Sequence, residues 1–142
     1  MAAPLPAFLD TAYMFALINT RDRWHSRARQ WEQALSEQQR RLVTSQFVLI
    51  EIADGLSTIG FREHAVRALD AVAGSSFVEI ISASPQLYSD ALDLYRKRRD
   101  KEWGLTDCSS FVIMQQRGLL DALTSDQHFE QAGFRALLTK EP

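Results

Sequence analysis

The sequence has little of what stabilises small secreted folds and nothing that would cross a membrane. Cys108 is its only cysteine, so no disulfide can form within the chain, which fits a reducing compartment. No apolar run approaches the length of a membrane span, and the N-terminus lacks the basic and then apolar pattern of a signal peptide. We therefore expect a cytoplasmic protein that makes no contact with a membrane.

A strong charge of either sign is also absent, since the formal net charge is −2. Such a balance gives no global attraction for nucleic acid, so any contact with RNA must depend on a local patch. Repeats, low-complexity segments and linkers are missing as well. With 142 residues, 46% of them hydrophobic, the chain is long enough for a full core, and we expect one domain over residues 1–142.

Short apolar segments alternate with amphipathic ones along the chain. The expected strands are 7–10, 42–45, 77–81, 122–124 and 135–138. The expected helices are 11–18, 24–36, a helix after Ser45 that Gly60 interrupts, 61–73, a helix that starts at Ser84-Pro85, a helix from a Thr106 cap to Gly118, and a helix between a Ser125 cap and Gly133. Strands alternating with helices predict an α/β fold with a central parallel sheet flanked by helices.

Four acids stand where such a sheet gathers ligands. Asp10 ends the first strand, Glu51 lies about one and a half turns into the helix after the second strand, Asp107 lies at the start of a helix, and Asp126 follows the fourth strand. Because the carboxyl ends of parallel strands share one edge, all four could converge there. Oxygen ligands suit Mg²⁺ or Mn²⁺, and two such ions can stabilise the attacking and leaving oxygens of a phosphodiester.

Each acid taken alone also has a structural explanation. Asp10 could cap the following helix, Asp107 could interact with a helix dipole, and Asp126 could be a turn residue. Glu51 lies in the apolar stretch FVLIEIADGL and needs a partner, which a buried salt bridge would also supply. The joint occurrence of all four favours a metal site.

Four stretches together resemble the PIN-domain family, particularly its VapC-type toxin ribonucleases. They are FLDTAYMFALI, TSQFVLIEIADGL, DKEWGLTDCSSFVIMQQRGL and ALTSDQHFEQAGF, and they extend in the family's order from Phe8 to Phe134. The TDCSSF and LTSDQHFEQAGF motifs are specific in tandem, whereas the first Asp motif alone is weak. The resemblance implies a PIN-like three-layer fold.

The same resemblance implies an activity. It implies a Mg²⁺- or Mn²⁺-dependent endoribonuclease, with metal-bound water attacking an RNA phosphodiester. The acidic quartet that it implies as catalytic and metal-binding residues is Asp10, Glu51, Asp107 and Asp126. It also implies a homodimer inhibited by a small antitoxin, although the family has members that are not toxins.

A dense basic run precedes the Asp107 motif. It consists of Arg96, Lys97, Arg98, Arg99 and Lys101. These side chains could hold RNA phosphates, which supply most nucleic-acid affinity; a solvated helix end is the alternative.

Three residues near the predicted site are assigned structural roles. Trp103 could stack a base, but we expect a core anchor. His128 lies near Asp126, and we expect a hydrogen-bonded structural histidine; the three histidines lack zinc-ligand spacing with one another or with Cys108. We expect Cys108 to be a small buried residue and not a nucleophile.

Two functions other than a nuclease, a phosphatase and a non-catalytic scaffold, fit the sequence less well. A phosphatase with an aspartyl nucleophile usually has a second acid two residues on, where this chain has Ala12. A non-catalytic PIN-like scaffold that binds RNA or protein has little reason to keep four acids. The sequence therefore favours a metal-dependent ribonuclease.

Overall fold

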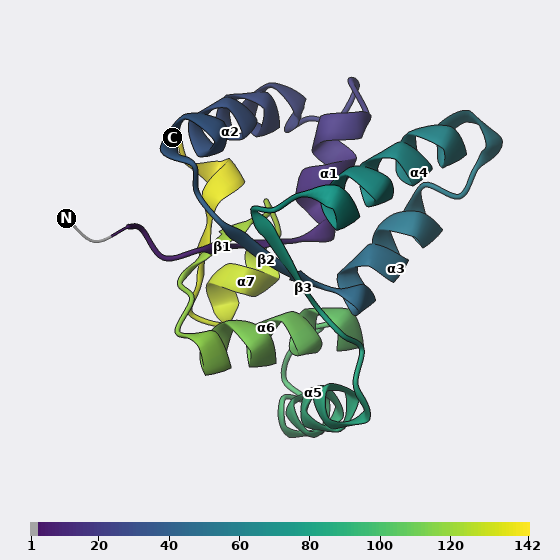
Figure 1. Cartoon of the computed structure of the whole chain (residues 1–142). Helices are drawn as coiled ribbons and strands as arrows, with labels where there is room; N and C mark the ends of the chain where they lie inside the picture. Colours follow the sequence, from purple (N-terminus) through teal and green to yellow (C-terminus); the bar gives the residue numbers. More distant parts are fainter. Residues whose placement is uncertain (1–2) are drawn as a thin grey trace.

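The computed structural model describes residues 3–142, which contain a five-stranded parallel sheet with helices on both faces (Figure 1). The strands are β1 (Ala7–Leu9), β2 (Leu42–Ser45), β3 (Val78–Ile81), β4 (Asp121–Leu123) and β5 (Arg135–Ala136). They lie in the order β3-β2-β1-β4-β5. Phe8 of the central strand is in register with Val43 of β2 on one side and with Ala122 of β4 on the other. The carboxyl ends of β1, β2 and β4 therefore lie at the same edge.

The helices form the two outer layers. They are α1 (Thr11–Ile18), α2 (His25–Gln38), α3 (Gln46–Gly55), α4 (Ile59–Gly74), α5 (Pro85–Lys97), α6 (Leu105–Arg117) and α7 (Gln127–Gln131), followed by the 3-10 helix η1 (Leu137–Thr139). Figure 1 shows α1, α2 and α4 on one side of the sheet and α6 on the other, with α5 packed outside α6. The predicted three-layer α/β fold is confirmed.

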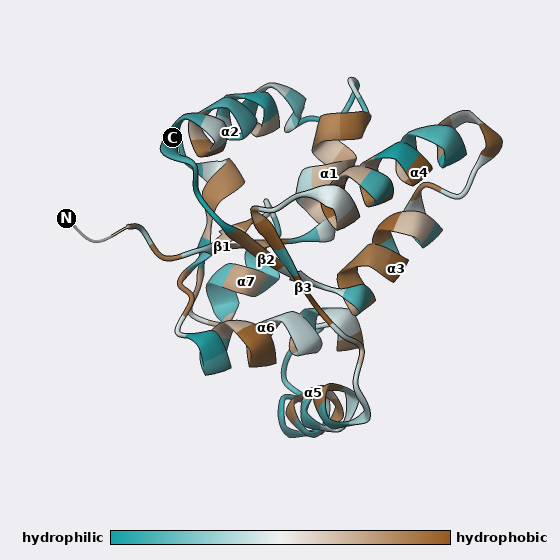
Figure 2. Cartoon of the chain, viewed as in Figure 1, coloured by the Kyte–Doolittle hydropathy of each residue, from teal (hydrophilic) through white to brown (hydrophobic). Residues whose placement is uncertain are grey.

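The central strands β1 and β4 are buried along their whole length. Phe8 and Leu123 have no exposed surface, and neither do Phe129 and Met114 from the flanking helices. Hydrophobic residues accordingly concentrate on the strands and on α1 and α3 in Figure 2, and their burial is the main favourable contribution to folding. Within residues 3–142, no helix has the length and apolar composition needed to span a membrane.

Several predicted helix ends are confirmed. Ser84 caps α5 by accepting the backbone N–H of Leu87 at 3.1 Å, and Pro85 is the first helical residue. Gly118 ends α6 with a φ of 65°, a conformation that glycine adopts at little cost.

Two predicted boundaries are wrong. Gly60 does not interrupt a helix but lies in the first turn of α4, because the chain leaves α3 earlier and buries Leu56 in the core. The strand predicted for 135–138 is only two residues long. Leu137 and Leu138 are both buried, and the chain turns into η1 there, where the Leu138 backbone N–H donates to the Thr124 carbonyl at 3.1 Å.

Candidate active site

Asp10 follows β1 directly and occupies the N-cap position of α1, with only 5% of its surface exposed. Its Oδ2 accepts a hydrogen bond of 2.8 Å from the hydroxyl of Thr124, which is 114 positions away in the sequence. Its backbone N–H also donates to the Leu123 carbonyl at 3.4 Å. The Asp10 carboxylate is therefore held at the place where β1 and β4 end side by side.

The electrostatic environment of Asp10 disfavours its own charge. Burial raises the pKa of Asp10 from 3.8 to about 7; the hydrogen bond from Thr124 opposes this rise, and the charges of Asp107 and Glu51 add to it. Within residues 3–142, Asp10 has no ion-pair partner. A buried carboxylate of this kind is costly when ionised, and a bound cation would relieve the cost.

Asp107 lies in the first turn of α6, where its Oδ2 accepts the backbone N–H of Gly104 at 3.0 Å. The N-cap of this helix is thus Gly104, and the prediction of a Thr106 cap is wrong, because the Asp107 carboxylate bonds back to the earlier residue. Burial raises the pKa of Asp107, and the charge of Asp126 adds to this rise, against the hydrogen bonds from Gly104 and His128.

Asp126 lies just past β4 and accepts the backbone N–H of His128 at 2.9 Å, which makes it the N-cap of α7. The predicted Ser125 cap is therefore wrong by one residue. The cause is Thr124, whose hydroxyl oxygen accepts the backbone N–H of Asp126 at 3.0 Å and so aligns the Asp126 carboxylate with the helix.

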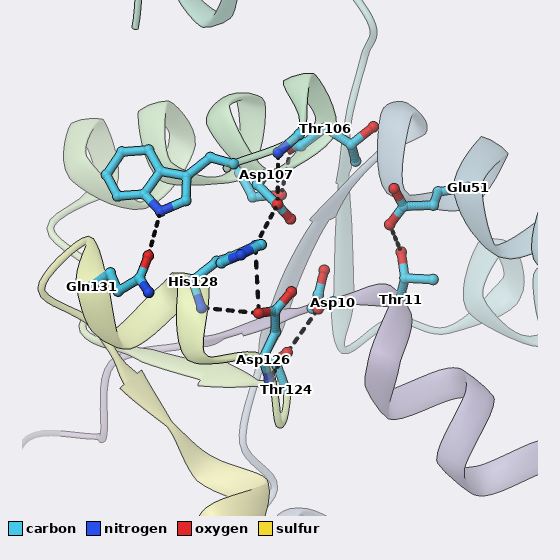
Figure 3. Close-up of polar contacts among 12 residues, drawn as sticks. Asp10, Thr11, Glu51, Thr106, Asp107, Thr124, Asp126, His128 and Gln131 are labelled. Carbon is cyan, nitrogen blue, oxygen red and sulfur yellow. Dashed lines mark hydrogen bonds and ion pairs between the residues drawn. The ribbon is translucent and has the colours of Figure 1, made fainter. Parts of the chain in front are cut away.

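The His128 ring lies between two of the acids (Figure 3). Its Nδ1 is 3.2 Å from Oδ2 of Asp107 and 3.5 Å from Oδ1 of Asp126. The expectation of a hydrogen-bonded histidine near Asp126 is confirmed, and Asp107, 21 residues away, is the closer partner.

Glu51 lies on the other side of Asp10 in Figure 3. It is half-buried on α3 and accepts a hydrogen bond of 2.5 Å from the Thr11 hydroxyl at the start of α1. The two helices approach closely because Gly55 leaves room for the Phe15 ring, which a Cβ at position 55 would overlap. Glu51 makes no ion pair in the described part of the chain, so the alternative of a buried salt bridge is wrong.

Thr124 is the residue of this region that sequence reasoning missed. Its side chain is fully buried, and its one hydroxyl donates to Asp10 while accepting from the Asp126 backbone. In the sequence it appears only as the end of an apolar run. Its position between a buried strand and Ser125-Asp126 could have indicated its role. A hydroxyl buried there needs hydrogen-bond partners.

The structure thus brings the predicted acids to one edge of the sheet in two groups. Donor atoms of Asp107, Asp126 and His128 all lie within 4.8 Å of one another. Asp10 is close enough to Asp107 and to Glu51 for their charges to shift its pKa. A donor set of mostly carboxylate oxygens, one of them buried without a counter-charge, fits Mg²⁺ or Mn²⁺.

The basic run lies at the end of α5 and in the loop that follows. Arg98 forms two hydrogen bonds of 3.0 Å with Asp100, and its guanidinium lies 4.9 Å from the centroid of the Trp103 ring. Arg99 is exposed and makes no ion pair within residues 3–142. Arg98, Arg99 and Lys101 line a cavity of about 430 Å³.

Two other residues that line this cavity, Trp103 and Cys108, have the structural roles expected from the sequence. Trp103 is 5% exposed, packs edge-on against Phe111 at 4.9 Å between ring centroids, and donates its Nε1–H to Gln131 at 3.0 Å, so it is a core anchor. Cys108 is buried, and burial raises the pKa of its thiol to about 11. A thiol of that pKa is not a nucleophile near neutral pH.

Comparison with known proteins agrees with this geometry. The family model described as PIN domain matches residues 7–135. The 23S rRNA-specific endonuclease VapC20 of Mycobacterium tuberculosis is 28% identical over 128 residues, which cover 89% of this chain and 94% of the relative. The crystal structure of M. tuberculosis VapC20, described as a sarcin-ricin loop cleaving toxin, matches with a TM-score of 0.80 and 26% identity over 96% of this chain and 99% of that one. The resemblance to VapC-type toxin ribonucleases is confirmed, and this chain belongs to the PIN domain family.

Proposed function

We propose that this protein is a metal-dependent endoribonuclease that hydrolyses RNA phosphodiester bonds and acts as the toxin of a toxin–antitoxin pair. The observation that supports it most is the buried Asp10, which has no cationic side-chain partner within residues 3–142 and lies at one sheet edge with three further acids. Within this proposal residues 1–142 act as a single PIN domain in the cytoplasm. Its partners are an RNA substrate, a small antitoxin and a second copy of the chain.

Asp10, Glu51, Asp107 and Asp126 would hold the Mg²⁺ or Mn²⁺ as catalytic ligands. When bound, such a cation supplies positive charge that stabilises the reacting phosphodiester and lowers the pKa of water. The chain's own hydroxyls orient the ligands. Thr124 fixes Asp10 and Thr11 fixes Glu51 through their hydrogen bonds.

The basic run would hold the RNA backbone. Arg96, Lys97, Arg98, Arg99 and Lys101 extend along the end of α5 to the cavity beside Gly104, and Gly104 is bonded to Asp107. A phosphate held in this cavity would approach Asp107 through Gly104, which lines the cavity. Arg98 is already paired with Asp100, so Arg99 and Lys101 are the stronger candidates for phosphate contacts.

The relative named for cleavage of 23S rRNA supports ribosomal RNA as the first substrate to test. Purified protein is incubated with end-labelled RNA that contains a sarcin-ricin loop, with Mn²⁺, with Mg²⁺ or with EDTA. We expect cleavage with either metal and none with EDTA. An unchanged rate in EDTA would contradict the metal dependence, and RNA binding without cleavage would favour the scaffold function.

Asp10→Asn and Asp107→Asn keep the side-chain shape and remove the charge that binds metal. Each should lower cleavage by about 10²–10³-fold, since such losses amount to several kcal/mol of barrier. Asp126→Asn should be the most tolerant change. Asp54→Asn is the matched control, because Asp54 is exposed on the same helix as Glu51. Wild-type rates in Asp10→Asn and Asp107→Asn would overturn the assignment of the site.

A further inference from the structure

We propose that His128 is a nitrogen ligand of the metal centre and forms, with Asp107 and Asp126, a cation position that takes Mn²⁺ in preference to Mg²⁺. This inference rests on the proposed metal-dependent function. It adds to the four acids a ligand of different chemistry, and it predicts which ion binds more tightly.

The spacing of the three side chains suits a single small cation. Two donors bound side by side to an octahedral ion are roughly 3 Å apart, because each lies about 2.1 Å from the ion and they subtend about 90°. Nδ1 of His128 is 3.2 Å from the Asp107 oxygen and 3.5 Å from the Asp126 oxygen. The ring nitrogen therefore already lies at the distance that two neighbouring ligands require.

The fold holds the histidine in this position from several directions. Its backbone N–H is fixed by Asp126, and the next residue, Phe129, is fully buried against Phe111 with 4.9 Å between ring centroids. Gln131, at the end of α7, is bonded to Trp103 in the segment before α6. The position of the ring relative to Asp107 is thus fixed by the packing of α7 on α6.

The position is also open enough for an ion to enter. The side chains of His128, Asp107 and Asp126 are 23%, 17% and 36% exposed. Asp10, by contrast, is 5% exposed, and Glu51 offers only oxygen. The acidic edge therefore has an oxygen-only part and a part that contains nitrogen.

The chemistry of the donors predicts the metal preference. Both ions bind carboxylates, and Mg²⁺ takes oxygen ligands and keeps its waters. Mn²⁺ belongs to the first-row transition metals and accepts an imidazole nitrogen more readily than Mg²⁺ does. A site with two carboxylates and an imidazole should therefore bind Mn²⁺ more tightly than Mg²⁺. If His128 only donated a hydrogen bond to Asp107, its removal would weaken both ions alike.

Pulsed electron paramagnetic resonance of Mn²⁺ bound to the wild-type protein tests the ligand directly. A coordinated imidazole produces nitrogen modulation of the electron spin echo, and we expect that modulation in the wild type. His128→Asn should lose it, whereas the matched control His64→Asn, at an exposed position of α4, should keep it. Bound Mn²⁺ without nitrogen modulation in the wild type would overturn the inference, and this spectrum does not depend on how any variant folds.

Isothermal calorimetry with each ion alone measures the preference. We expect His128→Asn to weaken Mn²⁺ binding by about 10–100-fold and Mg²⁺ binding much less. An equal loss for both ions would reduce His128 to a residue that positions Asp107 and would overturn the inference while leaving the proposed function intact. If the wild type bound no Mn²⁺, or if Asp107→Asn bound it as tightly as the wild type, the proposed function would be overturned as well. The two failures are therefore distinguishable.

Discussion

Asp10 and Asp121 are buried at opposite ends of the same sheet, and their environments differ in one respect. Asp121, the first residue of β4, is 7% exposed and accepts hydrogen bonds from Arg40 at 2.8 Å and from Arg135 at 2.6 Å. Asp10 is 5% exposed and accepts a hydrogen bond from the Thr124 hydroxyl. Burial raises the pKa of both carboxyls, but the two guanidinium groups reverse the shift for Asp121 and hold its pKa below 3.8.

The comparison shows that burial alone does not tell a structural acid from a functional one. The chain supplies two cationic partners to Asp121, so the charge of that residue is balanced inside the fold. It supplies no cationic partner to Asp10 among the described residues, although both acids are buried. An acid that the protein leaves unbalanced at the end of a central strand is suited to a cation from solution.

The largest expected difference is in stability. Asp121→Asn removes a charge and leaves Arg40 buried with a weaker partner, so we expect a loss of about 3 kcal/mol in the free energy of unfolding. Asp10→Asn in EDTA should be as stable as the wild type or more stable, because it removes a charge that the site repels. Urea unfolding of the three proteins in EDTA measures both effects.

Added Mn²⁺ extends the same experiment. A ligand that binds only the folded state stabilises it by mass action, so the wild type should gain stability and Asp10→Asn should gain less. Asp121→Asn should keep the full gain, since it lies at the other end of the sheet. If Asp10→Asn were as unstable in EDTA as Asp121→Asn, Asp10 would be a structural residue and the contrast between the two ends would disappear.

The pH dependence of stability should have opposite signs at the two sites. The folded pKa of Asp10 is about 7, above its unfolded value near 3.8, so ionisation costs stability as pH rises from about 4 to about 7. The folded pKa of Asp121 is depressed, so its contribution is present above about 3.8 and is lost as pH falls further.

Urea midpoints measured in EDTA from about pH 3 to about pH 8 separate these effects, because this range includes the ordinary pKa values of carboxyl groups and the raised pKa of Asp10. Asp10→Asn should flatten the decline between about pH 4 and pH 7. Asp121→Asn should flatten the loss at the acid end instead. A decline toward neutral pH that persists unchanged in Asp10→Asn would mean that another group causes it.

The smallest expected effect concerns the guanidinium groups. Arg98 is paired inside the chain, as Arg40 is, whereas the exposed Arg99 is not. Arg99→Gln should therefore weaken RNA binding by a few-fold and lower the slope of log K against log salt by about 0.7–0.9. Arg62→Gln on α4 is the matched control, because Arg62 is exposed, makes no ion pair within residues 3–142 and lies on another layer of the fold. Filter-binding titrations over a salt series measure the slopes, and equal slopes for Arg99→Gln and the wild type would assign Arg99 to a solvated helix end.

The sequence predicted what depends on local pattern. The alternation of strands and helices and the order of the four acids were both readable, because Asp10, Asp107 and Asp126 follow a strand or open a helix. Glu51 was readable as an acid in an apolar stretch. The pairing of Asp121 with Arg40 could not be predicted from the sequence, since the two residues are 81 positions apart and neither belongs to a recognisable motif. The contact of His128 with Asp107 was missed for the same reason, and its visible neighbour, Asp126, is the more distant carboxylate.

The predicted helix starts at the site are wrong for a different physical reason. Thr106 and Ser125 are good capping residues by type, yet Gly104 and Asp126 hold the cap positions. At both places the acids themselves make the capping contacts, because Asp107 accepts the Gly104 N–H and Asp126 accepts the His128 N–H. These two errors lie at the proposed site, whereas the wrong boundaries at Gly60 and at 135–138 lie outside it.

The position of β1 has a consequence for how the molecule is made. The central strand β1 pairs with β2 and with β4, and Thr124, just past β4, lies 114 positions after Asp10 in the sequence. A growing chain can pair β1 with β2, but the other edge of β1 stays bare and Asp10 lacks its Thr124 partner until residues beyond β4 have emerged. Closing so long a loop is a slow step in folding. Asp107 and Asp126 also follow β3 in the chain, so the four acids can come together only after residues 107–126 have been synthesised.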